Sequence, residues 1–199
     1  MAVPGRAGGR DTASQILDVA ERLVQTRGFN AFSYGDVAAE VGVTKPALHY
    51  HFAGKAELGE ALVARYAARF QAALEHIDAT TDAAAKKLAA YADLYQQVLM
   101  EDRMCLCGML AADYDTLPDT MRHAVVTFFD RNETWLAGVL EQGIREGTLR
   151  ASGPSREIAQ MVIGTLEGAM LVARTYHDSA RFVTTAKCLL AELARGPGS

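Results

Sequence analysis

Residues 32–58, with the sequence FSYGDVAAEVGVTKPALHYHFAGKAEL, constrain the fold of this chain more than any other stretch. Ser33 and Asp36 have the spacing of a capping box, and apolar residues then recur at helical spacing. Gly42 is expected to end this short helix, because glycine takes the left-handed backbone conformation that a tight turn between helices requires.

A second short helix is expected from about Lys45 to about His51. Thr44 is a favourable N-cap, and Pro46 in the first turn removes no intrahelical hydrogen bond. Leu48 is expected to pack inward. The side chains left outside are polar or aromatic: Lys45, Pro46, His49, Tyr50 and His51. Two short helices joined by a tight turn are typical of a helix-turn-helix, whose second helix enters the major groove of DNA.

The segment VTKPALHYHFAGKAEL resembles the recognition-helix signature of TetR-type regulators, and SYGDVAAEVG resembles the helix before it. The resemblance covers roughly the first quarter of the chain. It implies contacts to bases or phosphates from six residues: Thr44, Lys45, Pro46, Tyr50, His51 and Lys55. It also implies that Ser33 and Tyr34, at the start of the supporting helix, bind backbone phosphate. At the position of His49 the family usually has a tyrosine that contacts phosphate. The His49 imidazole either makes this contact instead, or the contact is lost.

Some of these side chains have a structural alternative. For Tyr50 and His51 the alternative is packing against the next helix, but we favour DNA contact because Leu48 already fills the inward direction. For Phe52 we favour packing. Lys55 is either an ordinary solvated lysine or, because it opens the next helix, a long stem that reaches a phosphate.

The composition indicates a folded protein and does not exclude DNA binding. The chain has 199 residues, of which 50% are hydrophobic, and a formal net charge of -4. Residues 1–55 hold six Lys/Arg and five Asp/Glu, whereas the remaining residues hold fourteen and nineteen. The net negative charge therefore lies in the C-terminal part of the chain, and the N-terminal part can still bind DNA phosphates through its positive side chains. The first ten residues are rich in Gly and Pro. Arg6 and Arg10 belong either to an arm that enters the minor groove of DNA or to a disordered tail.

Three cysteines, Cys105, Cys107 and Cys188, form no even disulfide framework, and no secretion signal opens the chain, so we expect a reducing cytoplasm. No apolar run approaches the roughly 18 residues of a membrane span. On a helix, Cys105 and Cys107 would lie about 200° apart, which disfavours a shared metal. One of them is either a reactive thiolate activated by Arg103 or by the helix N-terminus, or, as we favour, a buried small hydrophobe. Cys188 is expected to pack.

The rest of the chain has helical periodicity throughout, so we expect an all-α protein. Residues 1–54 would form an N-terminal arm and a three-helix DNA-binding domain, and residues 55–199 a helical effector-binding and dimerisation domain. Besides the pair in the helix-turn-helix, helices are expected at about 12–27, 55–77, 82–101, 104–114, 118–146, 155–176 and 179–194.

The last two helices are apolar over more than one face and contain Gly164, Gly168 and Ala169, which allow close helix approach. We interpret them as a dimer interface, the alternative being that they are internal to one subunit. Dimerisation also follows from the mode of DNA recognition, since one short helix contacts few base pairs and two copies are needed for a selective palindromic site. The family resemblance implies a four-helix bundle at this interface.

The remaining helices are rich in methionine and aromatic residues, which suit either an ordinary core or a cavity for a small hydrophobic ligand. Because the resemblance implies a ligand pocket, we assign as candidates Tyr95, Met104, Cys105, Met109, Tyr114, His123, Trp135 and Met161.

The leading interpretation is a TetR-type repressor that binds a palindromic operator as a dimer and is released by a small hydrophobic effector. One alternative is a regulator that senses oxidants or electrophiles through a cysteine. A weaker one is an all-α enzyme that uses Cys105 or Cys107 with His123 or His76. Since no phosphate loop, HExxH, GxSxG or metal-spaced ligand set occurs, we expect no catalytic residue, cofactor or metal.

Overall fold

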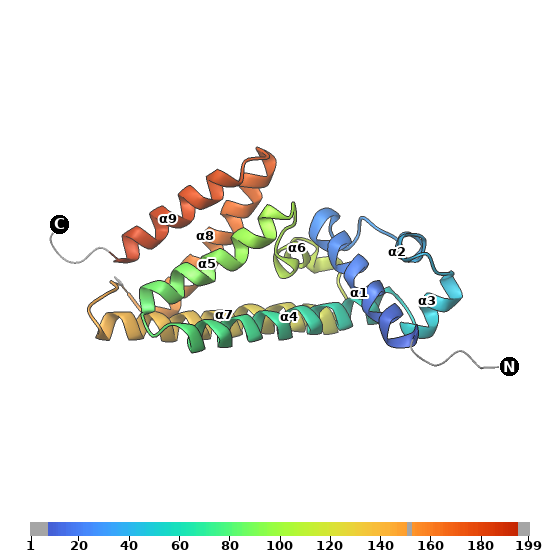
Figure 1. Ribbon diagram of the computed structural model, residues 1–199, viewed down its shortest axis with the longest axis horizontal. Coiled ribbons are helices and arrows are strands. Elements are labelled where there is room, and N and C mark those ends of the chain that lie inside the picture. The colour runs from blue at the N-terminus through green and yellow to red at the C-terminus, as the bar shows by residue number, and fades with distance from the viewer. Residues whose placement is uncertain (1–7, 151–152, 195–199) are drawn as a thin grey trace.

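The computed structural model describes residues 8–150 and 153–194, and the side chains of these from Thr12 onward. This part of the chain contains helices and no strand, which confirms the all-α prediction (Figure 1). Arg6 and the side chain of Arg10, the proposed arm, lie outside the described residues. The elements are α1 (Gly8–Arg27), α2 (Tyr34–Val41), α3 (Lys45–His51), α4 (Lys55–Thr80), α5 (Ala84–Met100), α6 (Leu106–Ala112), the 3-10 turn η1 (Tyr114–Thr116), α7 (Asp119–Arg145), α8 (Ser155–Thr175) and α9 (Ser179–Ala194).

Local signals set the ends of α2 and α3. The Ser33 hydroxyl accepts the Asp36 amide at 3.2 Å and the Asp36 carboxylate accepts the Ser33 amide at 2.6 Å, which completes the predicted capping box. These bonds lower the pKa of Asp36. Gly42 has a φ of 77°, as the tight turn requires, and Thr44 caps α3 by accepting the Ala47 amide at 3.3 Å.

The long helices α4 and α7 run side by side along the longest axis of the molecule, with α5, α8 and α9 packed above them (Figure 1). The close approach of α4 and α7 depends on Gly59, because an added Cβ would lie 2.5 Å from Met121 Sδ. The helix-turn-helix lies at one end of this axis and the end of α9 at the other. The helix-turn-helix and the C-terminal end of α9 therefore lie at opposite ends of the molecule.

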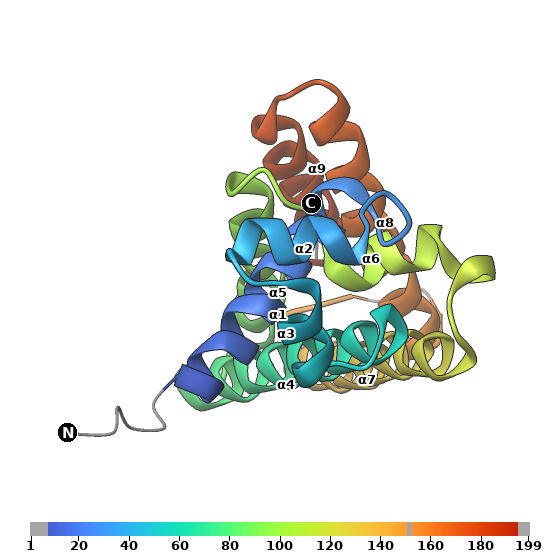
Figure 2. The same cartoon turned by 90° about the vertical axis from the view of Figure 1, so that its right-hand side faces the viewer.

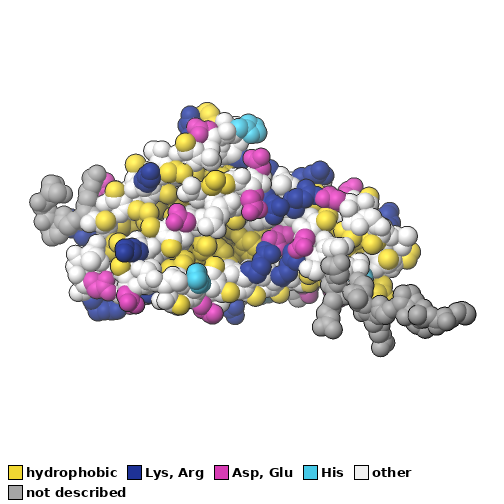
Figure 3. Space-filling model, viewed as in Figure 1, with side chains coloured by type: hydrophobic (Ala, Val, Ile, Leu, Met, Phe, Trp, Pro, Cys, Tyr) yellow, Lys and Arg dark blue, Asp and Glu magenta, His cyan; other side chains and the backbone are white. Residues whose placement is uncertain are grey.

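Helix α1 is held to the rest by several bonds. The Met104 amide donates to Gln25 O at 3.1 Å, and the Asp113 carboxylate accepts the Phe29 amide at 2.7 Å. The buried Glu21 pairs with two arginines of α4, one of them Arg65 at 2.9 Å. Charged side chains of both signs gather where α1 meets α4 (Figure 3). These contacts join the N-terminal helices firmly to α4 and α6.

Two details differ from the sequence-based prediction. Helix α6 is shorter than expected, because Cys105 takes the N-cap position and a 3-10 turn follows Asp113. The prediction that Cys188 packs was wrong: Cys188 is exposed on α9 in the single chain. The prediction that Phe52 packs is confirmed, since Phe52 is buried at the end of α3.

Candidate DNA-binding surface and effector region

Helix α3 lies at the end of the molecule that faces the viewer in Figure 2. Most of the side chains predicted to contact DNA from this helix are exposed. Leu48 is 0% exposed and anchors the helix, whereas Tyr50 is 87% exposed. Also exposed are Thr44, Lys45, Pro46 and His49, while His51 is half-buried. A short, well-capped helix with one buried anchor and a polar, aromatic outer face has the form needed to enter a major groove.

The structure brings Lys45 beside the start of α2. A Cβ added at Gly35 would lie 3.0 Å from Lys45 Cε and 3.4 Å from both Lys45 Nζ and Ser33 Oγ. The ammonium group, the Ser33 hydroxyl and the N-terminus of α2 thus share one place on the surface. All three favour an anion, so this is a suitable position for a DNA phosphate.

Three other predicted contact residues have partners inside the protein. The Tyr34 hydroxyl donates to Phe52 O, and burial followed by the nearby Glu57 raises its pKa. His49 Nδ1 lies 3.1 Å from Ala53 O, and its ring lies 4.8 Å from the ring of Tyr34. Tyr34 and His49 therefore fix how α3 joins α4.

The Lys55 ammonium group donates to Phe29 O and Phe32 O, both in the α1–α2 loop. It also lies 4.6 and 4.3 Å from the centres of the two phenylalanine rings. Burial lowers the pKa of Lys55. The sequence-based prediction for Lys55 was a phosphate contact. Because the two carbonyls and two rings hold its ammonium group, we instead favour a structural role for Lys55.

The predicted pocket residues are not gathered in one place. Tyr95, Met104 and Cys105 are buried in the interior of the helical body, and Trp135 stacks on Tyr91 with ring centres 5.7 Å apart. Met109 is half-buried beside Gly28.

Three predicted pocket residues lie on the surface. Tyr114 is exposed in the 3-10 turn and His123 on α7, while Met161 is 45% exposed on α8. The structure does not place these three with the buried residues, because helical rotation and the early end of α6 carry them outward. Periodicity identified apolar positions but not which helix faces which.

A buried polar cluster, which the sequence did not reveal, surrounds Tyr95. The Tyr95 hydroxyl lies 3.1 Å from the Tyr91 hydroxyl, and the Tyr91 hydroxyl donates to Asn132 Oδ1 at 3.2 Å. Burial raises the pKa of both phenols. Asn132, on α7, is 2% exposed, and a lone asparagine at an apolar position of that helix was the one available signal.

Glu167 on α8 completes this cluster. Its carboxylate accepts a hydrogen bond from the Cys105 thiol and lies so close to α6 that a Cβ at Gly108 would clash with Oε2. Oε1 is buried and has no hydrogen-bond partner among the described residues. Burial raises the Glu167 pKa to about 7. A buried carboxylate of this kind is typical of functional regions.

The two buried thiols are poorly suited to act as thiolates in this conformation. Cys105 is 2% and Cys107 0% exposed, and burial, followed by the charge of Glu167, raises the pKa of both. The Tyr66 hydroxyl donates to Cys105 Sγ at 3.6 Å. His123, the suggested catalytic partner, instead places Nδ1 2.7 Å from Asp119 O on the surface. No set of three or more metal-binding side chains occurs in the described part of the chain.

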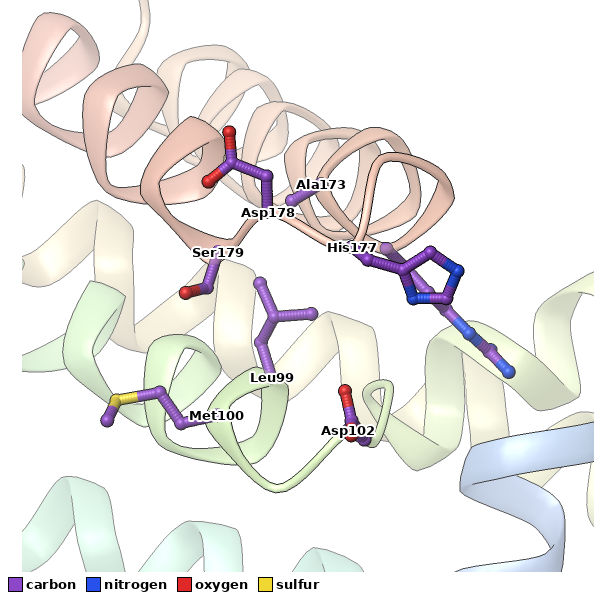
Figure 4. Close-up of a pocket in the computed structure, with 8 residues that line it drawn as sticks. Leu99, Met100, Asp102, Ala173, His177, Asp178 and Ser179 are labelled. Carbon is purple, nitrogen blue, oxygen red and sulfur yellow. The ribbon is translucent and has the colours of Figure 1, made fainter.

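The helical body is hollowed between the end of α5 and the α8–α9 turn, and along α4 and α7. A cavity of about 430 Å³ lies between the end of α5 and the α8–α9 turn, where Leu99 lies between Ser179 and Asp102, with Met100 and His177 toward opposite sides (Figure 4). The second place is a groove along α4 and α7, formed by adjoining hollows of about 410 and 570 Å³.

A helix-turn-helix unit built onto a larger helical body is the architecture of a DNA-binding transcriptional regulator. The family model described as bacterial regulatory proteins of the tetR family matches residues 16–62, and that of the tetracyclin repressor-like C-terminal domain matches residues 84–189. The chain belongs to the TetR family of transcriptional regulators.

Individual relatives agree with this assignment. The chain is 28% identical over 183 residues to the HTH-type transcriptional regulator LmrA of Bacillus subtilis, covering 90% of this chain and 95% of LmrA. It is 41% identical over 54 residues to TtgR of Pseudomonas putida, but this match spans only 27% of the chain and 26% of TtgR.

Solved structures show the same fold over nearly the whole chain. A TetR-family transcriptional regulator from Agrobacterium tumefaciens superposes with a TM-score of 0.90 at 30% identity, covering 94% of this chain and 99% of that one. A TetR regulator from Legionella pneumophila gives 0.83 at 30% identity, covering 97% and 100%. Among the described residues, no helix has the length and apolar character needed to span a bilayer.

Proposed function

We propose that this TetR-family regulator binds a palindromic operator as a homodimer through α3 and is a repressor released by a small-molecule effector. The outer face of α3 carries this proposal: Leu48 is buried, Tyr50 and His49 are exposed, and Lys45 lies beside the N-terminus of α2. Phosphate contacts would come from Ser33 and Lys45, and base contacts from the exposed α3 side chains. A cytoplasmic location stays a prediction.

The outer face of α8 supports dimerisation. Leu171 and Val172 are 54% and 51% exposed, and Gly164 and Met161 lie about two and three turns before them on that face. A Cβ added at Gly164 would meet nothing within 4 Å, so a partner helix has room to approach. Exposed apolar side chains in a row on one helix are typical of an interface. We therefore place Met161 at the dimer interface and not in the effector pocket.

Helix α6 is suited to connect an effector to the DNA-binding end. Gly108 of α6 and Cys105, the N-cap of α6, contact Glu167, and Asp113, just after α6, holds the Phe29 amide in the α1–α2 loop. A ligand that binds one conformation more tightly than another shifts the balance between them. Displacement of α6 would thereby change the separation of the two α3 helices in the dimer.

The test is DNA binding by Tyr50→Ala. In fluorescence anisotropy titrations, we expect the natural protein to bind the DNA upstream of its own gene. The Tyr50→Ala variant should bind this DNA at least about tenfold more weakly. Tyr176→Ala is the matched control, because Tyr176 is an exposed aromatic residue at the end of α8, and it should bind DNA normally.

The oligomeric state is measured on the same samples. Tyr50→Ala should remain a dimer by analytical ultracentrifugation, since Tyr50 lies on α3 and not on the proposed α8 interface. A folded protein that binds no DNA at low salt, or a Tyr50→Ala variant that binds as well as Tyr176→Ala, contradicts the proposal.

A further inference from the structure

We propose that His49 binds a DNA phosphate only as a positively charged imidazolium, so that each subunit takes up a proton when the protein binds DNA. The inference rests on the proposed function, because it concerns the same DNA-binding surface. The elements that surround His49 are α2, α3 and the start of α4, which meet at the end of the molecule that faces the viewer in Figure 2.

The Ala53 carbonyl fixes the position of one proton on the His49 ring. His49 Nδ1 lies 3.1 Å from Ala53 O, and a carbonyl oxygen only accepts hydrogen bonds, so Nδ1 carries a proton. A neutral imidazole has a single N–H group, which leaves Nε2 with a lone pair and no proton. His49 is exposed, and its Nε2 has no hydrogen-bond partner among the described residues. Nε2 is therefore the ring nitrogen that is available to DNA.

The position of His49 favours the DNA backbone over the bases. His49 lies one turn after Lys45 on the same side of α3, since residues four apart on a helix are neighbours. Its ring lies 4.8 Å from the ring of Tyr34, the first residue of α2. Lys45 and the start of α2 are where we place a phosphate. Tyr50 lies farther round α3, on its most exposed side, where base edges would be reached.

A phosphate at this position excludes the neutral form of the ring. The phosphate oxygens of DNA accept hydrogen bonds, so they would face the lone pair of Nε2. When Nε2 takes up a proton, Nδ1 still donates to Ala53 O, and Nε2 donates a charge-assisted bond to the phosphate. Histidine changes its charge between about pH 5 and 8. The affinity for DNA should therefore rise as the pH falls through this range.

The charged groups around His49 permit this change. Tyr34, from α2, stays neutral, because burial followed by the charge of Glu57 raises the pKa of its hydroxyl. From α4, the Glu57 carboxylate accepts the Ala53 amide at 2.7 Å, so one negative charge lies beside the residue that binds Nδ1. Lys45 is the positive group on the same side of α3. Glu57 and Lys45 act on an imidazolium in opposite directions, and the bound phosphate adds the charge that favours it.

Proton uptake is measured directly on the full-length protein. Isothermal titration calorimetry with the upstream DNA, in buffers of different ionisation enthalpy, gives the number of protons that bind with it. We expect up to about two per dimer, one for each His49, and an affinity at least about tenfold higher at about pH 6 than at about pH 8. The slope of log affinity against log salt should steepen by about 0.9 for each phosphate that an imidazolium neutralises.

Two variants assign the proton to His49. His49→Tyr keeps an aromatic ring beside Tyr34 and supplies a hydroxyl that donates to phosphate without a change of charge, so it should lose most of the pH dependence. His123→Gln is the matched control. Its Nδ1 also lies near a backbone carbonyl, 2.7 Å from Asp119 O, but on α7, outside the DNA-binding surface. This variant should keep the full pH dependence, and circular dichroism checks that both are folded.

The tautomer is tested without DNA. Nitrogen-15 NMR of the free protein at about pH 8 should show the neutral His49 ring with its proton on Nδ1 and none on Nε2. This measurement does not depend on the proposed function, since it concerns only the bond to Ala53 O.

Three results would overturn the inference: a neutral ring with its proton on Nε2, DNA binding without proton uptake, or a pH dependence that His49→Tyr leaves unchanged. Any of these, in a protein that binds its upstream DNA, leaves the proposed function intact. A His49→Tyr variant that loses a base preference while its proton uptake stays normal would show that His49 contacts a base, and this also rejects the phosphate contact. Absence of DNA binding at every pH rejects the proposed function itself.

Discussion

The DNA-binding end and the helical body of this protein are specified by different kinds of interaction. In α2 and α3, each end is fixed by residues within a few positions: Ser33 with Asp36, Gly42, and Thr44 with Ala47. In the body, Glu167 of α8 contacts Cys105 at the N-cap of α6, and Asn132 of α7 contacts Tyr91 of α5. The first set is local in sequence, whereas the second exists only after distant helices have packed.

This difference has energetic consequences. A local cap contributes about 1 kcal/mol, and its loss affects one helix end. A buried polar group that is hydrogen-bonded to distant helices loses its partners only when those helices separate. Changing such a group therefore affects the free energy of unfolding of the entire protein. Substitutions in the body should therefore have larger effects on stability, and substitutions on α3 larger effects on DNA binding.

The largest expected effect concerns Glu167. Its pKa rises from 4.5 to about 7 on folding, so the folded protein holds a proton that the unfolded chain has released between these pH values. Stability should therefore fall as the pH rises from about 4.5 to 7, by up to about 3 kcal/mol in total. Glu167→Gln, which carries no titrating group, should lack this part of the pH dependence. Urea unfolding across this range, at fixed protein concentration, measures it.

Glu157→Gln is the control, since Glu157 is an exposed carboxylate in the first turn of the same helix. It should follow the natural protein at every pH. If instead the curve for Glu167→Gln runs parallel to that of the natural protein, the carboxylate is not buried as the structure indicates.

The contrast between local and long-range interactions also explains what the sequence was able to predict. The capping box, Gly42 and Thr44 made α2 and α3 predictable almost to the residue. The effector region was not predictable in the same way. The spacing of apolar residues predicts which segments are helical, but it does not show which neighbouring helix Tyr114 or Met161 faces. Glu167 was not predicted as a site residue, since a glutamate on an amphipathic helix is normally solvated.

A second prediction concerns the joint between the two regions. Asp113→Ala removes the acceptor of the Phe29 amide, in a partly buried hydrogen bond, and of the Asn30 amide at 3.4 Å. We expect a loss of about 2 kcal/mol in the free energy of unfolding, because a partly buried N–H loses its bond to a charged acceptor. Hydrogen exchange at Phe29 should accelerate. Asp113→Asn, which keeps an acceptor oxygen, should restore most of the loss, and protection at Phe29 unchanged in Asp113→Ala would contradict this joint.

A smaller effect is expected at the turn between α2 and α3. Gly42 has a φ of 77°, and a Cβ there would meet nothing within 4 Å, so Gly42→Ala costs only backbone strain, about 1 kcal/mol. Gly54→Ala is the matched control, because Gly54 is equally open but extended, with a φ of -169°. Thermal unfolding should distinguish the two variants, and equal stability would show that the turn does not depend on glycine.

The smallest effect on stability, and the sharpest test of the comparison, comes from two lysines. Lys45 is exposed beside the start of α2, so Lys45→Ala should change stability by less than about 0.5 kcal/mol. It should lower the slope of log affinity for DNA against log salt by about 0.9 for each phosphate that the variant no longer neutralises. Anisotropy titrations at several salt concentrations measure this slope.

Lys55→Ala should show the opposite pattern. Its ammonium group holds two carbonyls of the α1–α2 loop and lies over two phenylalanine rings, so its removal should destabilise the protein and leave the salt slope nearly unchanged. A salt slope lowered as much as in Lys45→Ala would mean that Lys55 leaves these carbonyls to bind phosphate on DNA. In that case a residue held by tertiary packing would also contact the DNA backbone. The start of α4 would then contribute both to DNA binding and to the packing of the body, and the two regions would not be separate there.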